Sequence, residues 1–466
     1  MRALLKFLVI PLVIGAVVVG GAWLWAGRVE GPRIEIRQPG NFIGQATPLE
    51  LVVETPGGQF SRVDVTIEQG GQTHQVFSLA QPAQGAVTQE TADRLFVIRQ
   101  VGKRDIPALQ AGPARIIVRA ARPVVYGLRE AESEAIRDVD VRLEPPRVAV
   151  LSTLHYVNHG GAELVVYRAT PADVASGVRV GGQDYPGFPA SGAGIKADDS
   201  TKVAFFALPF DQDLLTPISL YAKDPAGNEV TTPLDHRPFP KPFKRSRIEI
   251  DDRFLSRVVP AIAAESPEMK ISTAPGDLVQ SFLRINRDMR QADAQTIAGL
   301  AAKTSPQMLW KDNFQPLGNA SVEAGFADNR TYFYMDMEID RQVHLGFDLA
   351  VTERIPVLAG NNGIIVYADD LGIYGNCVIV DHGLGVQSLY AHLSSIDVKV
   401  GDKVDKGRTL GRSGMTGLAG GDHLHFTILV NGTAVNPVEW WDPKWVQDRV
   451  FRKISETGGA PVGAVQ

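Results

Sequence analysis

Short segments of alternating apolar and polar residues, separated by Gly, Pro and Asn, dominate the chain between residues 49 and 222. These runs are Leu49–Glu54, Val63–Glu68, Ala114–Ala120, Ala149–Leu154, Leu164–Arg168, Val203–Leu208 and Ile218–Ala222. A period of two residues is typical of strands with one buried face, and many short strands between turn residues favour β-sandwiches. We therefore expect two β-sandwich modules, at residues 30–145 and 146–240.

The pattern becomes helical after these modules. Four apolar residues recur at helical spacing, namely Leu278, Phe282, Ile285 and Met289. Asp277 precedes them as an N-cap, and the apolar segment Phe254–Ala264 predicts a second helix. We expect residues 241–305 to contain a linker and a helical connector whose apolar stripe serves packing. Its place before the last domain would let it hold or obstruct that domain.

Five of the nine histidines lie between His344 and His425, where the runs are again strand-like. In the run that begins at His423, apolar residues alternate with the two histidines, so His423 and His425 leave the same face of one strand. His392 shares a face with Tyr390 in the preceding run. It would reach the same surface if these two strands are neighbours.

These residue types are those of a catalytic zinc site, which takes three ligands from His, Asp, Glu or Cys and leaves one position for water. The segments His344–Asp348, Tyr390–Leu393 and His423–His425 supply such a set and leave histidines for proton transfer. Gly346 interrupts its segment as a bulge or turn does, which lets the two end residues converge. Each segment alone is more often an ordinary polar strand face, but the combination favours a metal. His382 precedes a Gly-rich turn and is interpreted as structural, with contact to zinc or substrate as the alternative.

Composition argues against several other functions. Cys377 is the only cysteine, so the chain has no intramolecular disulfide, and its apolar neighbours indicate a buried strand residue rather than a catalytic thiol. A net charge of −5 over 466 residues, without a long basic run, does not indicate nucleic-acid binding. The Pro-rich basic stretch Arg237–Arg247 is interpreted as an extended interdomain linker, with binding to an acidic surface as the lesser alternative.

The N-terminus predicts a membrane segment. Met1–Lys6 is basic, and Phe7–Ala26 is an uninterrupted run of 20 uncharged residues. As a helix this run is about 30 Å long, which matches a bilayer core. A cleaved signal peptide is the competing interpretation, but its apolar region spans only roughly 7–15 residues, and Trp23 and Trp25 leave no clear cleavage site. We expect residues 1–27 to be a cytoplasmic N-terminus and a transmembrane signal anchor.

The histidine segments resemble those of the lysostaphin-like, LytM-type zinc metallopeptidases, which cut peptide bonds in bacterial peptidoglycan. The resemblance runs from about Ala324 to Trp445 and includes Gly363–Ala368, Tyr374–Gly383 and Val400–Gly407. It implies a C-terminal antiparallel-β peptidase domain at residues 306–452, followed by a flexible tail at residues 453–466.

The resemblance also implies the roles of the site residues. His344, Asp348 and His425 would bind one zinc ion, and His392 and His423 would be the catalytic histidines. The implied reaction is hydrolysis of peptidoglycan peptide crosslinks by zinc-activated water. His423 is assigned as the general base, and His392 as the group that stabilises the oxyanion or protonates the amine. These two roles are interchangeable on the sequence alone.

The bond that is cut stays open, because family members cleave either oligoglycine bridges or direct stem-peptide crosslinks. The loops Asp369–Tyr374 and Met415–Asp422 are expected to select among them. A thin, directly crosslinked wall would make a D-alanyl–diaminopimelate bond the expected substrate.

Two other functions fit parts of the sequence. Many relatives of this family have lost zinc ligands and activate cell-wall amidases, so a non-hydrolytic activator or binding protein is the main alternative. The complete ligand set favours the enzyme. Val398–Gly407 also resembles the turns of biotinyl and lipoyl domains, which suggests an adaptor, but no Met–Lys–Met hairpin is present to be modified.

The expected organisation is a multidomain, mainly β protein. Tyr221–Val230 resembles the closing hairpin of bacterial immunoglobulin-like domains, which implies that the sandwich modules are of that type. We expect a single-pass protein of the cell inner membrane whose C-terminal domains lie in the periplasm. Its expected partners are peptidoglycan stem peptides, the inner membrane and an unidentified regulatory cell-wall protein, and not nucleic acid.

Overall fold

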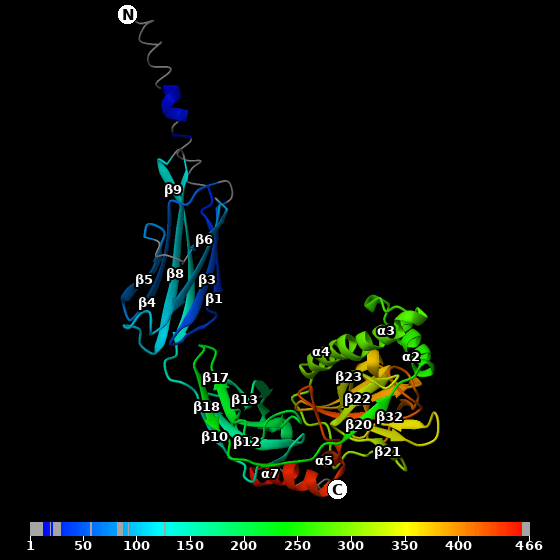
Figure 1. The fold of residues 1–466 in the computed structure, drawn as a ribbon. Helices are drawn as coiled ribbons and strands as arrows, with labels where there is room; N and C mark the ends of the chain where they lie inside the picture. The colour runs from blue at the N-terminus through cyan, green and yellow to red at the C-terminus, as the bar shows by residue number, and fades with distance from the viewer. Residues whose placement is uncertain are drawn as a thin grey trace, which may run out of the picture. The chain divides into compact units, whose positions relative to one another are not determined.

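The computed structural model describes residues 13–18, 20, 21, 29–55, 58–81, 87–91, 93–124 and 127–458. The described chain is mainly β with few helices, as predicted, and it forms two compact units (Figure 1). Unit 1 contains described residues of Met1–Pro146 and Lys223–Glu229, and unit 2 contains those of Arg147–Ala222 and Val230–Gln466. The finer module boundaries proposed from the sequence stay predictions.

The predicted membrane anchor, residues 7–26, lies mostly outside the described residues. Within it, residues 13–18, 20 and 21 are helical. In the part of the chain that the structure describes, no helix combines the length and the apolar character that crossing a bilayer requires. The anchor therefore stays a prediction.

Two sheets face each other in unit 1. The first has the order β1 (Arg33–Gln38), β3 (Thr47–Glu54), β7 (Arg94–Val101), β6 (Val87–Thr91). The second has the order β2 (Phe42–Ile43), β9 (Arg129–Val141), β8 (Gly112–Val124), β4 (Arg62–Gln69), β5 (Gln72–Ser78). Alternate residues such as Leu51 and Val65 are fully buried in one core between the sheets, which confirms the period-two interpretation of these runs.

Unit 2 begins with two further four-stranded sheets. One has the order β10 (Arg147–Val150), β12 (Ala162–Thr170), β16 (Thr201–Ala207), β15 (Phe188–Pro189). The other has the order β14 (Gln183–Pro186), β13 (Ala175–Val180), β17 (Ile218–Lys223), β18 (Glu229–Pro233). Every alternating run of the sequence contains a strand, although in Ala149–Leu154 the strand ends at Val150.

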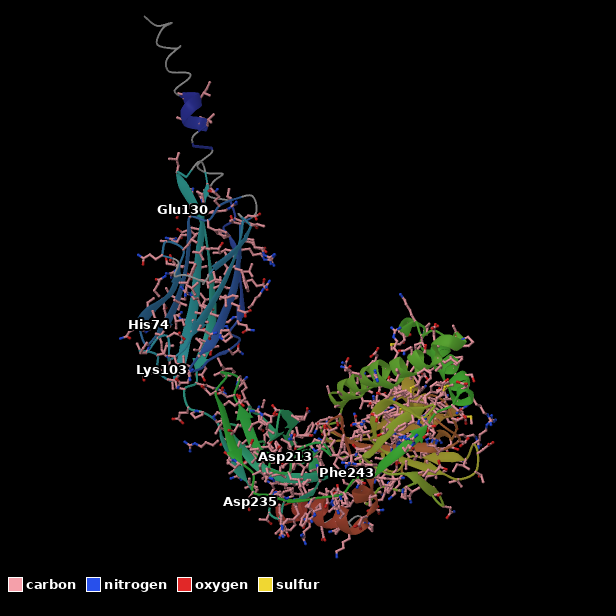
Figure 2. The ribbon with its side chains drawn as sticks, in the orientation of Figure 1. His74, Lys103, Glu130, Asp213, Asp235 and Phe243 are labelled. Atoms are coloured by element: carbon pink, nitrogen blue, oxygen red, sulfur yellow. The ribbon has the colours of Figure 1, made fainter. Side chains whose placement is uncertain are left out.

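The predicted linker Arg237–Arg247 is extended and is attached to unit 2 at both ends. Its strand β19 (Arg237–Phe239) pairs with β11 (Tyr156–Asn158), and β20 (Arg245–Glu249) pairs with β22 (Asp328–Tyr334). Between them lies Phe243, which is labelled in Figure 2. Its ring packs against those of His159 and Phe210, with centroid distances of 5.1 and 6.2 Å. The segment is therefore a strap on the surface of unit 2 rather than a free spacer.

The C-terminal half of unit 2 is built on an eight-stranded sheet. Its order is β21 (Ser321–Ala324), β24 (Phe347–Ala350), β32 (Leu424–Val430), β28 (Val386–Leu393), β27 (Asn376–Gly383), β26 (Gly363–Asp370), β30 (Lys403–Val404), with β33 (Thr433–Val435) paired to β32. Two smaller sheets flank it: β20–β22–β23 (β23, Met337–His344) and β25 (Pro356–Leu358), β31 (Thr409–Arg412), β29 (Ser395–Ile396). Apart from the parallel β20–β22 pair, the strand pairs of these sheets are antiparallel.

Helices cover part of this half. The connector consists of α2 (Asp252–Glu265), α3 (Leu278–Arg284), the π-helical segment η4 (Ile285–Met289) and α4 (Arg290–Ala301). Short helices also lie near the C-terminus, namely α5 (Pro437–Trp441), α6 (Pro443–Val446) and α7 (Arg452–Glu456). Three of the four residues of the predicted stripe are buried, with Phe282 and Ile285 fully enclosed beside Tyr332, and Leu278 is partly buried. Asp277 was expected to cap this helix, but its carboxylate accepts from Ser272 Oγ instead.

A single apolar core joins the strands of residues 147–222 to the C-terminal half. All seven residues of β16 are buried, because its second face packs against other parts of unit 2 rather than against water. The ring of Phe205 lies 5.7 Å from Trp440 and 6.3 Å from Trp310, measured between centroids. The two parts of unit 2 are therefore packed like one domain.

Buried polar contacts cross the same boundary. Glu439 on α5 accepts from Asn158 Nδ2 at 2.6 Å and from the backbone N–H of Ala162 at 2.9 Å. Lys453 on α7 forms a buried ion pair with Glu163 at 2.7 Å. Such groups are stable in an apolar interior only while their partners stay in place.

The shared core predicts how fragments behave. A fragment of residues 306–452 would expose the faces of Trp310 and Trp440 that contact Phe205, whereas residues 147–466 keep that core covered. We expect the longer fragment to be monomeric and cooperatively folded, and the shorter one to aggregate or bind a hydrophobic dye. Size-exclusion chromatography and thermal melts measure this difference. A monodisperse 306–452 fragment with the melting temperature of the longer one would contradict it.

Glu439 predicts a pH dependence of stability. Burial raises its pKa to about 7, so the protonated form is favoured in the folded state. This contribution is fully present below the unfolded-state pKa and is lost as the pH rises through 7, at a cost of up to about 3 kcal/mol. Urea unfolding at pH 5 and pH 8 should show a smaller pH dependence for Glu439→Gln than for the wild type. The exposed control Glu456→Gln should match the wild type.

Candidate metal centre and active site

The structure brings the predicted site residues together at the edges of neighbouring strands. His344 ends β23, and Asp348 lies in β24 after a break of two residues. In the central sheet, Asp348 is the register partner of His425 in β32, and His425 is also paired with Ala391 in β28. Residues 77 positions apart in the chain, Asp348 and His425, are therefore adjacent because their strands are hydrogen-bonded neighbours.

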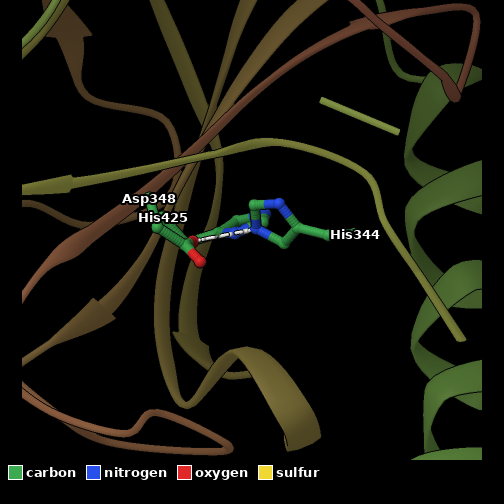
Figure 3. A group of neighbouring side chains, drawn as sticks. All are labelled: His344, Asp348 and His425. Carbon is green, nitrogen blue, oxygen red and sulfur yellow. Dashed lines mark hydrogen bonds and ion pairs between the residues drawn. The ribbon is translucent and has the colours of Figure 1, made fainter. Parts of the chain in front are cut away.

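Three ligand-type atoms converge at this point (Figure 3). His344 Nε2 lies 2.9 Å from Asp348 Oδ1 and 3.0 Å from His425 Nδ1, and His425 Nδ1 lies 3.0 Å from the same Oδ1. All three side chains are buried. Ligands of a tetrahedral zinc ion lie about 3.3 Å apart when the bonds are 2.0–2.1 Å long, so the triangle has nearly the size that such an ion requires.

The outer nitrogens of the two histidines show which nitrogen faces inward. His344 Nδ1 lies 2.9 Å from the carbonyl of Gly325, so Nδ1 carries the proton and Nε2 keeps its lone pair. His425 Nε2 donates to Oγ1 of Thr427, whose hydroxyl in turn donates to the carbonyl of Leu345. Burial lowers the pKa of His425 to about 4, so the ring is neutral near pH 7. Two lone pairs and a carboxylate oxygen thus meet without a donor, an arrangement that a bound cation satisfies.

Gly346 is needed for this close approach. A Cβ atom at this position would lie 2.6 Å from His425 Nε2 and 2.5 Å from Thr427 Oγ1. The predicted break at Gly346 is present between β23 and β24. Glycine therefore serves here to admit the His425 ring and its hydrogen-bond partner.

His392 reaches the site through a break in the alternation of its strand. Tyr390 is the register partner of Phe426, and Phe426 lies on the opposite face of the sheet from His425. With strict alternation His392 would lie on the same face as Tyr390, away from His425. His392 instead has a φ of 61°, a left-handed conformation that is uncommon for a residue other than glycine. Its ring centroid lies 4.8 Å from that of His423. The two strands are neighbours as expected, but the expectation that Tyr390 and His392 share a face is wrong.

The two further histidines present the same nitrogen to the site. The Nδ1 atoms of His392 and His423 each lie 2.8 Å from a backbone carbonyl, those of Thr416 and Gly421 respectively. Because a carbonyl only accepts, both Nδ1 atoms carry a proton and both Nε2 atoms are left for the cavity. Burial lowers the pKa of His392 well below its usual range. His423 Nε2 lies 3.4 Å from Asp348 Oδ1, and this carboxylate outweighs burial and raises the pKa of His423.

His382 and Cys377 lie outside this arrangement. His382 is fully buried, with Nδ1 2.6 Å from the carbonyl of Asn362 and Nε2 2.7 Å from Ser388 Oγ. Cys377 is buried in β27, where burial raises the pKa of its thiol well above the usual value. Both therefore have the structural positions expected from the sequence.

A cavity of about 100 Å³ lies at the candidate metal site and is lined by both His392 and His423. Tyr374 and Leu418 also line it, which places the two loops expected to select the substrate at the site. Sequence reasoning missed Arg290 of α4 and Arg330 of β22. Arg330 Nη2 donates to Asp348 Oδ2 at 3.0 Å. Neither arginine had a local sequence signal, because only the fold brings α4 and β22 to the histidine segments.

Comparison with known proteins identifies this part of the chain. Residues 342–437 match the family described as Peptidase family M23. Residues 342–437 form an M23 peptidase domain. The predicted LytM-type family is thereby confirmed for this domain.

The M23 domain is similar to parts of curated proteins. Over 97 residues it is 41% identical to the DD-carboxypeptidase/endopeptidase Mpg of Neisseria meningitidis serogroup B, covering 21% of this chain and 22% of Mpg. Over 96 residues it is 38% identical to the peptidoglycan DD-endopeptidase ShyA of Vibrio cholerae, covering 21% of this chain and 22% of ShyA. The chain thus matches about a fifth of the length of these relatives.

Among solved structures, the catalytic domain of the antimicrobial peptidase lysostaphin from Staphylococcus simulans is 31% identical to this chain, with a TM-score of 0.25. The similarity covers 28% of this chain and 98% of that structure.

The geometry predicts which substitutions remove a metal. His344→Ala, Asp348→Ala and His425→Ala each leave two ligands, so zinc affinity should fall by more than the roughly 10–100-fold typical of losing an outer hydrogen-bond partner. Thr427→Val, which removes such a partner, should fall within that smaller range. Zinc titration with a competing chelator measures both, and His236→Ala is the histidine control. Unchanged affinity in any of the three ligand variants would contradict the assignment.

Proposed function

We propose that this chain is a zinc metalloendopeptidase that hydrolyses peptide crosslinks of bacterial peptidoglycan. The observation that carries the proposal is the meeting of three buried acceptor atoms, without a donor, inside an M23 domain. Peptidoglycan is the proposed substrate because the domain is similar to peptidoglycan hydrolases. One of them is ShyA, a peptidoglycan DD-endopeptidase that is identical at 38% of the aligned residues.

His344 Nε2, His425 Nδ1 and Asp348 Oδ1 would hold the zinc ion. A zinc ion bound there supplies Lewis acidity, which polarises a carbonyl and lowers the pKa of water. The protein holds its ligands ready for that ion, because Gly325 and Thr427 keep the outer nitrogens of the two rings occupied. Arg330 occupies the second oxygen of Asp348, which leaves Oδ1 for the ion.

His392 and His423 carry out the proton transfers in this proposal. Each presents an Nε2 atom to the cavity, because its Nδ1–H is held by a backbone carbonyl. We assign His423 as the general base that takes a proton from water. We assign His392 as the group that stabilises the developing oxyanion or returns a proton to the leaving nitrogen.

We further propose that the protein is anchored in the cell inner membrane by residues 7–26, with its remaining domains in the periplasm. The apolar run of 20 residues after a basic start supports this location, and so does the periplasmic position of a peptidoglycan substrate. Membrane fractionation before and after a high-salt wash, with a variant lacking residues 1–28 as the control, tests the proposal.

Substitution of the proton-transfer histidines should separate metal binding from chemistry. His392→Ala and His423→Ala should keep close to one zinc per chain, while turnover falls by roughly 10²–10⁴-fold, the usual contribution of a general acid or base. Release of soluble fragments from purified peptidoglycan measures turnover, and metal analysis measures zinc. A zinc-loaded wild-type protein that releases nothing would favour the non-hydrolytic binding function instead.

A substrate with a better leaving group distinguishes the two histidines. An anilide leaves without protonation more readily than an alkyl amine, so a variant that lacks the acid should lose less activity on the anilide. We expect this smaller loss for His392→Ala and the full loss for His423→Ala. The opposite result would exchange the two roles.

A further inference from the structure

The cavity at the metal centre has an excess of positive charge. It is lined by two arginines, four histidines and only one carboxylate, that of Asp348. Asp328, outside the cavity lining, approaches Arg330 Nε at 3.7 Å and also accepts from Ser246. Even with Asp328 counted, a bound divalent cation leaves two positive charges in excess, since arginine stays charged in proteins. A site of this kind favours an anionic ligand.

Arg290 is held in place before any ligand arrives. Its Nε and Nη2 atoms donate to the carbonyl and to Oδ1 of Asn286, at 3.2 and 2.7 Å. Asn286 is itself fully buried and donates to Asp340 at 2.8 Å. Among the described residues, Arg290 Nη1 has no hydrogen-bond partner. The guanidinium is therefore fixed on one edge and free on another.

Arg330 also keeps donor capacity. Its Nη2 atom donates to Asp348 Oδ2, and its buried Nε atom lies 3.7 Å from Asp328, so the donors left for a ligand are those of the two Nη atoms. An arginine has five N–H donors in a planar fork that matches a carboxylate. Orienting Asp348 requires only one of these guanidinium groups, that of Arg330. The donors that remain on Arg290 and Arg330 are therefore available for another ligand.

Both arginines lie outside the M23 match, which spans residues 342–437. Arg290 begins α4 directly after the π-helical segment η4, and Arg330 lies in β22. The family assignment therefore gives them no role. A π-helical turn is a feature that recurs at functional sites, and here it places Asn286 beneath Arg290.

We propose that Arg290 and Arg330 form a subsite for a substrate carboxylate next to the scissile bond. The inference rests on the proposed peptidase function and specifies its substrate class. The preferred substrate is a peptide in which the carbon that carries the scissile nitrogen also carries a free carboxylate. Hydrolysis adds water across the amide, giving a carboxylate on the acyl side and an amine on that carbon. Bonds inside an oligoglycine bridge lack this carboxylate.

The test uses two synthetic crosslinked stem peptides with the zinc-loaded protein. They are identical except that the carboxylate beside the scissile nitrogen is free in one and a carboxamide in the other. Charge-assisted hydrogen bonds should give the wild type a kcat/KM about 10- to 100-fold higher for the free carboxylate. In Arg290→Gln this preference should fall toward one, while the rate on the carboxamide changes little, and Arg290→Lys should retain part of it.

Further variants separate this role from others. Arg330→Gln should also lose the preference, and its zinc content is measured because Arg330 contacts Asp348. Arg284→Gln, an exposed arginine of the same connector, should keep the full preference. Equal losses on both substrates in Arg290→Gln would instead show that this arginine stabilises the oxyanion, and an equal rate of the wild type on both substrates would overturn the subsite.

A binding measurement keeps the subsite testable apart from catalysis. The amine product with a free carboxylate should bind the zinc-loaded wild type about 10-fold or more tightly than its carboxamide, and Arg290→Gln should abolish the difference. If neither crosslinked peptide is hydrolysed, the proposed peptidase function fails, while this comparison still decides whether the carboxylate is recognised. Equal binding of both products by the wild type would overturn the inference.

Discussion

The site depends on one electrostatic constraint: three buried acceptor atoms meet within 3.0 Å and no donor lies among them. This constraint results from hydrogen bonds on the outer side of the two histidine rings. The carbonyl of Gly325 and the hydroxyl of Thr427 accept hydrogen bonds from the outer N–H groups of His344 and His425, which leaves both inner nitrogens as acceptors. These outer partners therefore determine the chemistry of the centre as much as the ligands themselves.

The rigidity of that centre comes from strands that are buried on both faces. In β32, His425 and Thr427 point to the site, while Phe426 and Ile428 belong to the core that includes Phe205. Residues that precede the helical connector therefore belong to the apolar core that supports the candidate metal site. Glu439 and Lys453 add polar contacts that hold these residues to the C-terminal helices.

Periodicity predicted the strands, the connector helices and the histidine segments, because each is a local pattern. It could not show that β16 is buried on both faces, since burial of the outer face depends on a distant part of the chain. Alternation also misplaced His392, whose left-handed backbone is set by its surroundings and not by the residue type. The sequence could not predict that Arg290 and Arg330 line the cavity, for a related reason. A single arginine in a helix or a strand has no local pattern that marks it as a site residue, and only the fold brings these two together.

The connector is part of the site rather than a spacer before it. Arg257 of α2 donates to the carbonyls of Ala419 and Gly420, in the loop whose Thr416 and Gly421 carbonyls accept from His392 and His423. Through α4 the same connector places an arginine in the cavity. A change in its packing would therefore alter both the orientation of the histidines and the charge that lines the cavity. Within this chain, helices outside the M23 domain supply elements that the central sheet alone does not contain.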